Sequence, residues 1–361
     1  MILRGGEDAK GLATTVCTRQ SRLVKHRTKL MAELKATKVP DSVKRTTLDG
    51  ELEAWLKSGC PTLGGHMPVE EMRREHQVLV PEKKVEVQAV EYLGIPSLDG
   101  KTTTSVRCYV PIKKNRRTSD GLVGALVYIH GGGWTVGNLD EFEGAMRIIA
   151  EESGHQVYAI EYHLAPEFKY PYQLKEVEAV LTWLAKNGKA RGVDPCRICI
   201  GGDSAGGNMS AVTCLRARDR EQSGYQGPDL AMQLLLYPET ALPFTTLAGS
   251  ENCTGYYLET SGVLLFAWNM LPQGQDHSVQ WITPLNAKSH GNLPPAHVVT
   301  NGFDPLRDVG HSYAQALQKD GTTVSFVHHE DMTHGFIQFT EKSKRCLQLT
   351  KDIGHVLHDA L

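Results

Sequence analysis

The chain has 361 residues, a formal net charge of −2 and 40% hydrophobic residues. A charge this close to neutral gives no electrostatic reason to expect nucleic acid or an anionic membrane surface as a partner. No run approaches the ~18 apolar residues that a membrane-spanning helix needs, so we expect no stable membrane insertion. The length suits one large domain with a cap, or two domains.

The first 80 residues are mostly helix-prone. Leu23, Leu30, Met31 and Leu34 lie on one side of a basic stretch, a pattern that also fits a helix on a membrane surface. Glu33 and the shortness of the apolar face favour a cap segment over that alternative.

The N-terminus and the cysteines favour a cytoplasmic protein. Residues 1–8 carry two acids and no apolar core of a signal peptide. Eight cysteines are scattered along a chain that is too long to need disulfides. Cys196 and Cys199 form a C-x-x-C without a second pair, and Cys199 lies in an expected strand, so a metal or redox pair is disfavoured. We expect reduced thiols, no metal and no cofactor.

The rest of the chain alternates between strands and helices. Two runs, 85–92 and 105–112, alternate apolar and polar residues, which is typical of half-exposed edge strands. From residue 122 the strands become continuous apolar runs, which indicates burial on both faces by helices. The expected buried strands are 122–129, 155–161, 197–202, 231–236, 296–301 and 323–328, and the expected helices are 140–152, 173–187, 205–220, 307–319 and 340–358.

The stretch Gly202–Gly206 reads G-D-S-A-G and lies between an expected strand and an expected helix. This is the G-x-S-x-G nucleophile elbow, in which small residues permit a tight turn that raises the serine above the sheet. The helix that begins there directs free N–H groups at developing negative charge. Ser204 is therefore the candidate nucleophile.

A second glycine-rich loop follows the apolar run 124–129. Residues 130–134 read H-G-G-G-W, and three consecutive glycines expose backbone N–H groups that can stabilise an alkoxide. A flexible loop is the alternative interpretation. The expected oxyanion donors are the backbone N–H groups of Gly132, Gly133 and Ala205. The expected supporting residues are His130, which braces the loop by hydrogen bonding, Gly131 and Asp203.

Two more polar residues follow apolar runs. Asp304 comes after the run 296–300 and His334 after 324–327, so both belong at the carboxyl ends of strands, where open α/β sheets build their sites. The order serine, acid, histidine is that of the α/β-hydrolase fold. Asp308 is the alternative acid, but it should point away from the strand end, so Asp304 is preferred.

These motifs, together with residues 162–167 and 304–308, resemble those of the hormone-sensitive-lipase-like (GDSAG, family IV) carboxylesterases over roughly residues 81–361. The resemblance implies an α/β-hydrolase fold, with a mostly parallel eight-stranded sheet flanked by helices, in a catalytic domain 81–361. It also implies a helical cap made of residues 1–80 and completed by an insertion, 240–283. His163 departs from the family, which usually has arginine there. Members are often homodimers through an edge strand, so a homodimer is also a candidate assembly.

The resemblance implies a serine carboxylesterase acting on small esters with short- to medium-chain acyl groups. A lyase or cyclase, and amide or thioester hydrolysis, are alternatives that would use the same three residues. A non-catalytic small-molecule receptor is disfavoured, because receptors built on this fold lack the histidine that His334 supplies here. Part of the aromatic and apolar cluster in the insertion should line the substrate pocket. That cluster contains Phe244, Tyr256, Tyr257, Leu258, Leu264, Phe266, Trp268 and Trp281.

Overall fold

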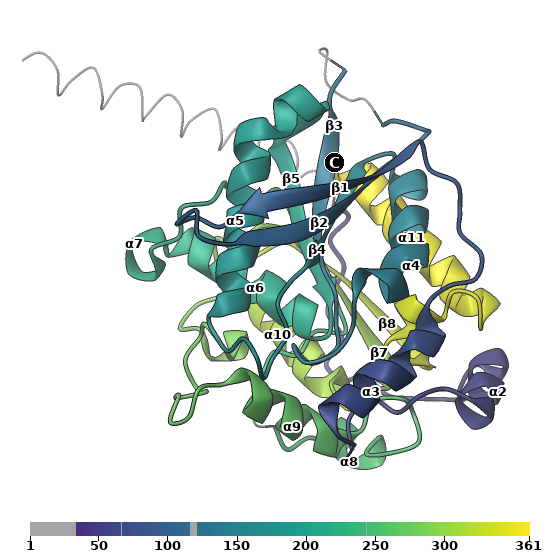
Figure 1. The fold of residues 1–361 in the computed structure, drawn as a ribbon. Coiled ribbons are helices and arrows are strands. Elements are labelled where there is room, and N and C mark those ends of the chain that lie inside the picture. Colours follow the sequence, from purple (N-terminus) through teal and green to yellow (C-terminus); the bar gives the residue numbers. More distant parts are fainter. Residues whose placement is uncertain (1–33, 66, 116–120, 243) are drawn as a thin grey trace, which may run out of the picture.

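The computed structural model describes residues 34–65, 67–115, 121–242 and 244–361. Its centre is one eight-stranded sheet with the order β1-β2-β4-β3-β5-β6-β7-β8 (Figure 1). β2 is antiparallel to both β1 and β4, and the remaining neighbours are parallel. The strands are β1 Ala89–Pro96, β2 Thr103–Val110, β3 Val123–Ile129, β4 Gln156–Glu161, β5 Val193–Asp203, β6 Gln233–Leu236, β7 Ala296–Phe303 and β8 Val324–Thr333.

Helices cover both faces of this sheet. In Figure 1, α4 (Leu139–Ser153) and α11 (Lys344–Ala360) lie to the right of the strands. On the other side lie α5 (Tyr172–Asn187), α6 (Ala205–Arg218) and α10 (Arg307–Lys319). The remaining helices are α2 Gly50–Ser58, α3 Val69–Glu75, α7 Arg220–Ser223, α8 Leu247–Glu251 and α9 Thr260–Met270, with 3-10 turns at His76–Leu79, Gly188–Arg191, Pro284–Asn286 and Phe336–Phe339.

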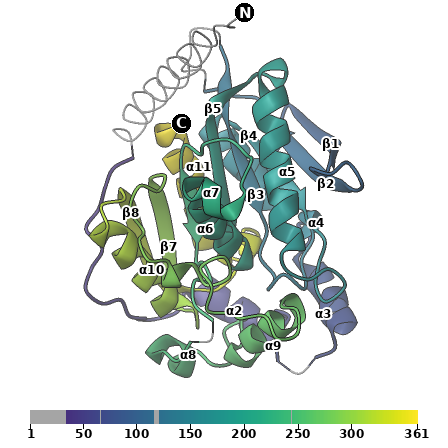
Figure 2. The ribbon, with the colours of Figure 1, turned by 90° about the vertical axis from the view of Figure 1, so that its left-hand side faces the viewer.

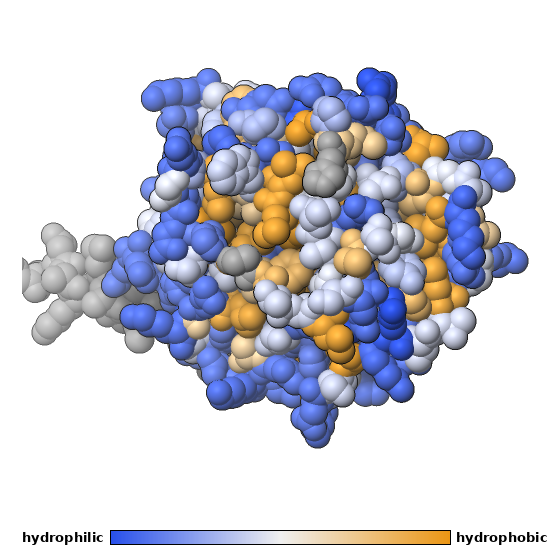
Figure 3. All heavy atoms as spheres, turned by 90° about the horizontal axis from the view of Figure 1, so that it is seen from below, coloured by the Kyte–Doolittle hydropathy of each residue, from blue (hydrophilic) through white to orange (hydrophobic). Residues whose placement is uncertain are grey.

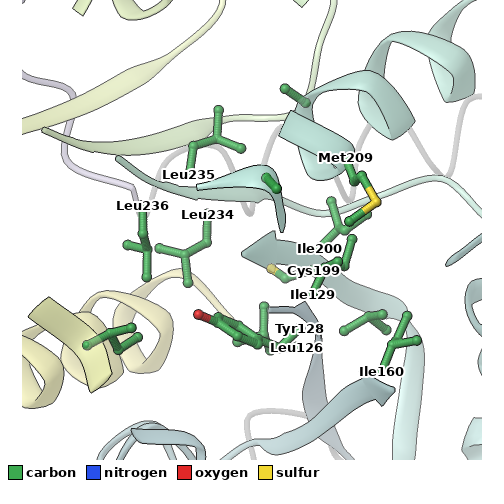
Figure 4. Close-up of a cluster of buried hydrophobic side chains, with 14 of the residues drawn as sticks. Leu126, Tyr128, Ile129, Ile160, Cys199, Ile200, Met209, Leu234, Leu235 and Leu236 are labelled. Atoms are coloured by element: carbon green, nitrogen blue, oxygen red, sulfur yellow. The ribbon is translucent and has the colours of Figure 1, made fainter. Parts of the chain in front are cut away.

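The core lies between the central strands and the helices that cover them. Every residue of β3 is buried, as its uninterrupted apolar sequence predicts for a strand covered on both faces. Leu126 and Ile129 of β3, Ile200 of β5 and Met209 of α6 belong to one cluster (Figure 4). This packing holds the carboxyl ends of the parallel strands in place, and the site is built there.

The outer edge of β8 is covered by the chain's own N-terminal segment. The Thr37 N–H donates to the Val324 carbonyl at 2.9 Å, and the Thr46 N–H donates to the Glu330 carbonyl at 3.0 Å. An uncovered edge strand offers unpaired backbone groups to another chain. Here residues 37–49 satisfy several of those groups along β8.

The sequence predicted most of these elements closely. The eight-stranded, mostly parallel sheet with flanking helices is confirmed. β1 begins four residues later than the expected run 85–92, because its pairing with β2 is set by the turn in which the Ser97 N–H donates to the Thr102 carbonyl. Within the described ranges, no helix is both long enough and apolar enough to cross a bilayer.

The expected cap segment lies only partly within the described residues. The apolar side chains expected at 23, 30 and 31 fall outside them, and the first helix that the structure describes begins at Gly50. α2, α3, α8 and α9 gather at one end of the molecule in both ribbon views (Figures 1 and 2). The division into a cap of 1–80 with 240–283 and a catalytic domain of 81–361 stays a prediction.

Two segments far apart in sequence join closely at this end. Leu63 forms a bridge with Leu258, and the Cα atoms of Gly64 and Gly262 are so close that a Cβ on either glycine would collide with the other. The outer surface there shows apolar areas separated by polar ones (Figure 3). α9 is therefore packed against the N-terminal segment as well as against the strand ends.

Candidate active site

Ser204 occupies the turn between β5 and α6. Its backbone has φ 54° and ψ −120°, a strained conformation for a residue other than glycine. The Ser204 N–H donates to the Leu236 carbonyl at 2.9 Å, which ties the turn to the end of β6. The side chain is 6% exposed. This is the elbow geometry that the G-D-S-A-G stretch predicts.

The glycines on either side of Ser204 are required by close packing. A Cβ on Gly202 would collide with the Ile129 carbonyl and with Gly206, and one on Gly206 would collide with the same carbonyl. The end of β3 thus passes directly beside the turn. Larger residues at either position would separate the elbow from the loop that follows β3.

His334 and Asp304 meet at the ends of β8 and β7. Nδ1 of His334 lies 2.8 Å from Oδ2 of Asp304, and both residues are almost fully buried. The Leu306 N–H donates to the other carboxylate oxygen at 2.8 Å, which fixes the orientation of Asp304. Nε2 of His334 is buried and has no hydrogen-bond partner among the described residues. Among the described residues, the imidazole is therefore held through one of its two nitrogens only.

Tyr237 connects Ser204 and His334. It directly follows Leu236, to which the Ser204 N–H is bonded, and its ring lies edge-on to the His334 ring at 4.8 Å between centroids. Tyr237 therefore places the serine and the histidine at the same end of the sheet.

Asp308, the alternative acid, is held elsewhere. Its Oδ2 accepts the Ala248 N–H at 2.8 Å and its Oδ1 pairs with Nε of Arg307 at 2.8 Å. Both oxygens therefore bind the start of α8 and α10 rather than His334. Asp304 contacts His334 and Asp308 does not, and the catalytic role of Asp304 stays a prediction.

The loop after β3 presents glycine N–H groups beside the elbow. Gly132 and Gly133 have φ of 110° and 59°, values that glycine adopts without strain. The Thr135 and Val136 N–H groups both donate to the Gly132 carbonyl, closing a tight turn. Within the described part of the chain, no acceptor is found for the N–H groups of Gly132 and Gly133.

Asp203 joins this loop to the elbow. Its Oδ1 accepts the Gly131 N–H at 2.8 Å and the Tyr128 hydroxyl at 2.7 Å. Burial raises the pKa of Asp203 to about 6, against the lowering effects of the Tyr128 hydrogen bond and of His334. A Cβ at Gly131 would collide with this carboxylate. Asp203 and Gly131 are therefore in direct contact, and their supporting role stays a prediction.

His130 packs as a brace within the same loop. Its Nδ1 donates to the Gly131 carbonyl at 2.7 Å, and its ring stacks on Tyr162 with 4.2 Å between centroids. The Tyr162 hydroxyl donates to the His130 carbonyl at 3.0 Å. Burial lowers the pKa of His130 to about 4, so the ring is neutral at pH 7.

His163, which departs from the family pattern, pairs with a carboxylate instead. Its backbone N–H and its Nδ1 bind the two oxygens of Glu176, at 2.9 and 2.7 Å. The side chain thereby fixes the start of α5 against the end of β4.

A small cavity lies between the strand ends and the side chains of α9, Leu63 and Leu258. It measures about 10 Å³, close to the ~10–15 Å³ that one water molecule needs. Phe266 of α9 lies so close to Gly133 that a Cβ there would collide with its ring. A substrate can enter only if wall side chains move. The walls are Leu63, Gly133, Trp134, Ser204, Ala205, Glu239, Leu258, Val263, Phe266 and Leu306.

The members of the predicted aromatic cluster lie in several different places. Leu258 and Phe266 line the cavity beside Ser204. Leu264 and Trp268 face outward, 56% and 80% exposed, and line a separate surface groove of about 620 Å³ that does not include Ser204. Tyr257 packs its ring on Gly335, the residue after His334.

The described residues contain no cluster of side chains suited to hold a metal ion, and the described cysteines form no disulfide. Cys196 is exposed and Cys199 is buried in β5, so the two thiols face different surroundings.

Sequence reasoning missed Tyr237 and Glu239, which follow β6. Tyr237 contacts the candidate histidine, and Glu239 lines the cavity. The signal was present, since residues just past the carboxyl end of a parallel strand gather at the site. The same rule that selected Asp304 and His334 selects these two.

Comparisons with known proteins agree with this geometry. A family model described as alpha/beta hydrolase fold matches residues 126–338. The carboxylic ester hydrolase LipN of Mycobacterium tuberculosis is 37% identical over 231 residues, which cover 63% of this chain and 61% of that relative. The carboxylesterase NlhH of the same species is 36% identical over 267 residues, or 72% of this chain and 78% of the relative.

A solved structure of an esterase is also similar to this chain. The hyperthermophilic esterase from the archaeon Pyrobaculum calidifontis superposes with a TM-score of 0.77 at 30% identity, covering 87% of this chain and 98% of that one. The chain therefore belongs to the alpha/beta hydrolase family of carboxylic ester hydrolases.

Proposed function

We propose that the protein is a serine carboxylesterase that hydrolyses small esters with short- to medium-chain acyl groups through an acyl-enzyme on Ser204. The observation that carries the proposal is the orientation of His334. Its Nδ1 is held by Asp304 at 2.8 Å, while its buried Nε2, at the end of the sheet where Ser204 lies, has no partner in the part of the chain that the structure describes.

In the first step, the Ser204 hydroxyl attacks the ester carbonyl and gives its proton to Nε2 of His334. Asp304 holds the imidazole in the tautomer that leaves Nε2 unprotonated and stabilises the imidazolium that forms. His334 then donates the proton to the departing alcohol, which leaves the acyl group on Ser204.

The negative charge that develops on the tetrahedral oxygen is stabilised by hydrogen-bond donors that are already in position before the reaction. The N–H groups of Gly132, Gly133 and Ala205 fill this role, and losing one such donor typically raises the barrier by ~3 kcal/mol. Asp203 keeps the glycine loop in place through the Gly131 N–H.

In the second step, water attacks the acyl-enzyme while His334 accepts its proton. His334 then returns the proton to the Ser204 oxygen, and the acid product is released. The reaction needs only the side chains and backbone groups named here and water. The walls beside Ser204 are mostly apolar and closely spaced, which supports a short or medium acyl chain.

Cytoplasmic location and homodimerisation belong to the same proposal. The lack of a disulfide among the described cysteines supports a reducing compartment. Fractionation tests the location, and sedimentation tests the assembly.

The test is a series of p-nitrophenyl esters from acetate to laurate, assayed with the wild-type protein and with Ser204→Ala. We expect the highest kcat/KM at short to medium chains and loss of turnover in Ser204→Ala, which should keep the wild-type circular dichroism spectrum. Retained turnover in Ser204→Ala would refute the proposal. Identifying the acid and alcohol formed from an alkyl ester separates hydrolysis from elimination.

A further inference from the structure

Glu239 is an acidic residue that the proposed hydrolysis does not use. It lies three residues past β6, and its N–H donates to the Ser204 carbonyl at 3.3 Å. Glu239 and Ser204 are the two cavity-lining residues whose side chains carry oxygen. The carboxyl group therefore lies beside the candidate nucleophile in surroundings that are otherwise apolar.

The Ala241 N–H and the Asn208 amide both act on this carboxyl group, but one of its oxygens still has no hydrogen-bond partner among the described residues. Oε2 accepts Nδ2 of Asn208 at 3.0 Å, and Asn208 is itself anchored by the Ile282 carbonyl at 2.9 Å. Oε1 is buried and has no partner among the described residues, although the side chain as a whole is 2% exposed. A buried polar atom without a partner destabilises the folded state, and such atoms are few in folded proteins. A ligand that supplied the missing partner would gain affinity here.

The position of the cavity indicates which part of an ester would meet Glu239. The walls include Ser204, Gly133 and Ala205, which bind the reacting carbonyl, but they do not include His334. The departing alcohol must lie beside His334, because it takes its proton from that residue. The cavity near Glu239 is therefore on the acyl side of the ester.

A hydroxyl group suits this carboxyl better than a charged group does. Burial raises the pKa of Glu239 to about 8, against the lowering effects of the Ala241 N–H and the Asn208 amide. Near pH 7 the group is mostly neutral, so it offers an ammonium ion little charge to pair with. A hydroxyl group can accept from the neutral acid and can donate to the carboxylate, so it satisfies Oε1 in both states.

We propose that Glu239 is a specificity-determining residue that hydrogen-bonds a hydroxyl group on the acyl chain, so that the protein prefers hydroxyacyl esters to plain acyl esters of equal length. The inference rests on the proposed esterase function and names its substrate class. A site built to hydrogen-bond a substrate hydroxyl discriminates strongly against the analogue that lacks it, because its buried polar group is then left without a partner.

The experiment compares p-nitrophenyl 3-hydroxybutyrate, both enantiomers, with p-nitrophenyl butyrate. The readout is the ratio of the two kcat/KM values, measured for wild type, Glu239→Gln and Glu239→Met. We expect the wild type to have a kcat/KM at least about tenfold higher for one hydroxy ester than for the butyrate. Glu239→Gln should keep most of this ratio. In Glu239→Met the ratio should fall by about tenfold. Methionine preserves the length and unbranched shape of glutamate and removes the hydrogen bond.

Glu141→Gln is the matched control. Glu141 is also buried with a pKa raised to about 8 by burial, but it bonds to Asn138 and Gln338 and does not line the cavity. We expect Glu141→Gln to keep the wild-type ratio. If Glu239→Met does not fold, the double variant Asn208→Leu/Glu239→Met removes both members of the pair and takes its place.

The outcomes separate the two proposals. A wild-type ratio of one or less, or an unchanged ratio in a folded Glu239→Met protein, would overturn the role of Glu239 while leaving the esterase proposal intact. A wild-type protein that hydrolyses neither ester would overturn the esterase proposal itself.

Discussion

The two sides of the cavity beside Ser204 are built differently. On the sheet side, Ser204 and the glycine loop are tied by hydrogen bonds to β6 and to Asp203, and Glu239 is tied to Asn208. On the cap side, Leu63, Leu258, Val263 and Phe266 contribute apolar side chains. Hydrogen bonds fix atoms to within fractions of an ångström, whereas apolar packing tolerates exchange of similar volumes. Under the proposed function, the sheet side performs the chemistry and the cap side selects substrates by size.

The largest expected change in kcat/KM comes from a substitution on the sheet side, where Asp304 and Asp308 are compared. Asp304→Asn should lower kcat/KM by about 10,000-fold, because an amide favours the wrong tautomer of His334. Asp308→Asn should change it less than about tenfold, since Asp308 bonds to Ala248 and Arg307 instead. Steady-state kinetics on p-nitrophenyl butyrate measure both, and equal losses would contradict the assignment of Asp304.

A smaller change in acyl-chain preference should follow when a cap-side side chain is shortened. Phe266→Ala removes the ring that lies over Gly133, so the ratio of kcat/KM for octanoate over butyrate should rise by about tenfold. Trp268→Ala is the control, because it lies on the same helix but is 80% exposed. An unchanged ratio in Phe266→Ala, or an equal rise in Trp268→Ala, would show that α9 does not set the acyl-chain preference.

The smallest effect concerns stability and its dependence on pH. The folded pKa of Glu239, about 8, lies above its ordinary value of 4.5, so ionisation destabilises the folded state. The penalty is absent below the ordinary value, grows as pH rises toward 8 and is then constant. The Tm of Glu239→Gln relative to wild type should therefore increase from pH 4.5 to pH 8, as measured by calorimetry. A difference that does not vary with pH would contradict the burial of an ionisable group at this position.

The sequence predicted the sheet side better than the cap side, for a physical reason. Continuous apolar runs and short motifs such as G-D-S-A-G report local structure and strand ends, so Ser204, Asp304 and His334 could be placed at one edge of the sheet. The contact between Gly64 and Gly262 joins residues almost two hundred positions apart, and no local pattern indicates it.

Two smaller misses show the same limit. The start of β1 depended on a turn at Ser97 rather than on the alternation of apolar residues before it. Glu239 follows a strand of only four residues, whose end is a weak signal, and its importance depends on an unpaired oxygen that only atomic packing reveals.

The most direct test of the nucleophile is covalent labelling with an alkyl p-nitrophenyl phosphonate, which mimics the tetrahedral intermediate of ester hydrolysis. Peptide mapping by mass spectrometry should find one phosphonyl group on the peptide that contains Ser204, with strongly slowed labelling in His334→Ala and no label there in Ser204→Ala. Labelling at another residue with equal speed in all three proteins would contradict the account.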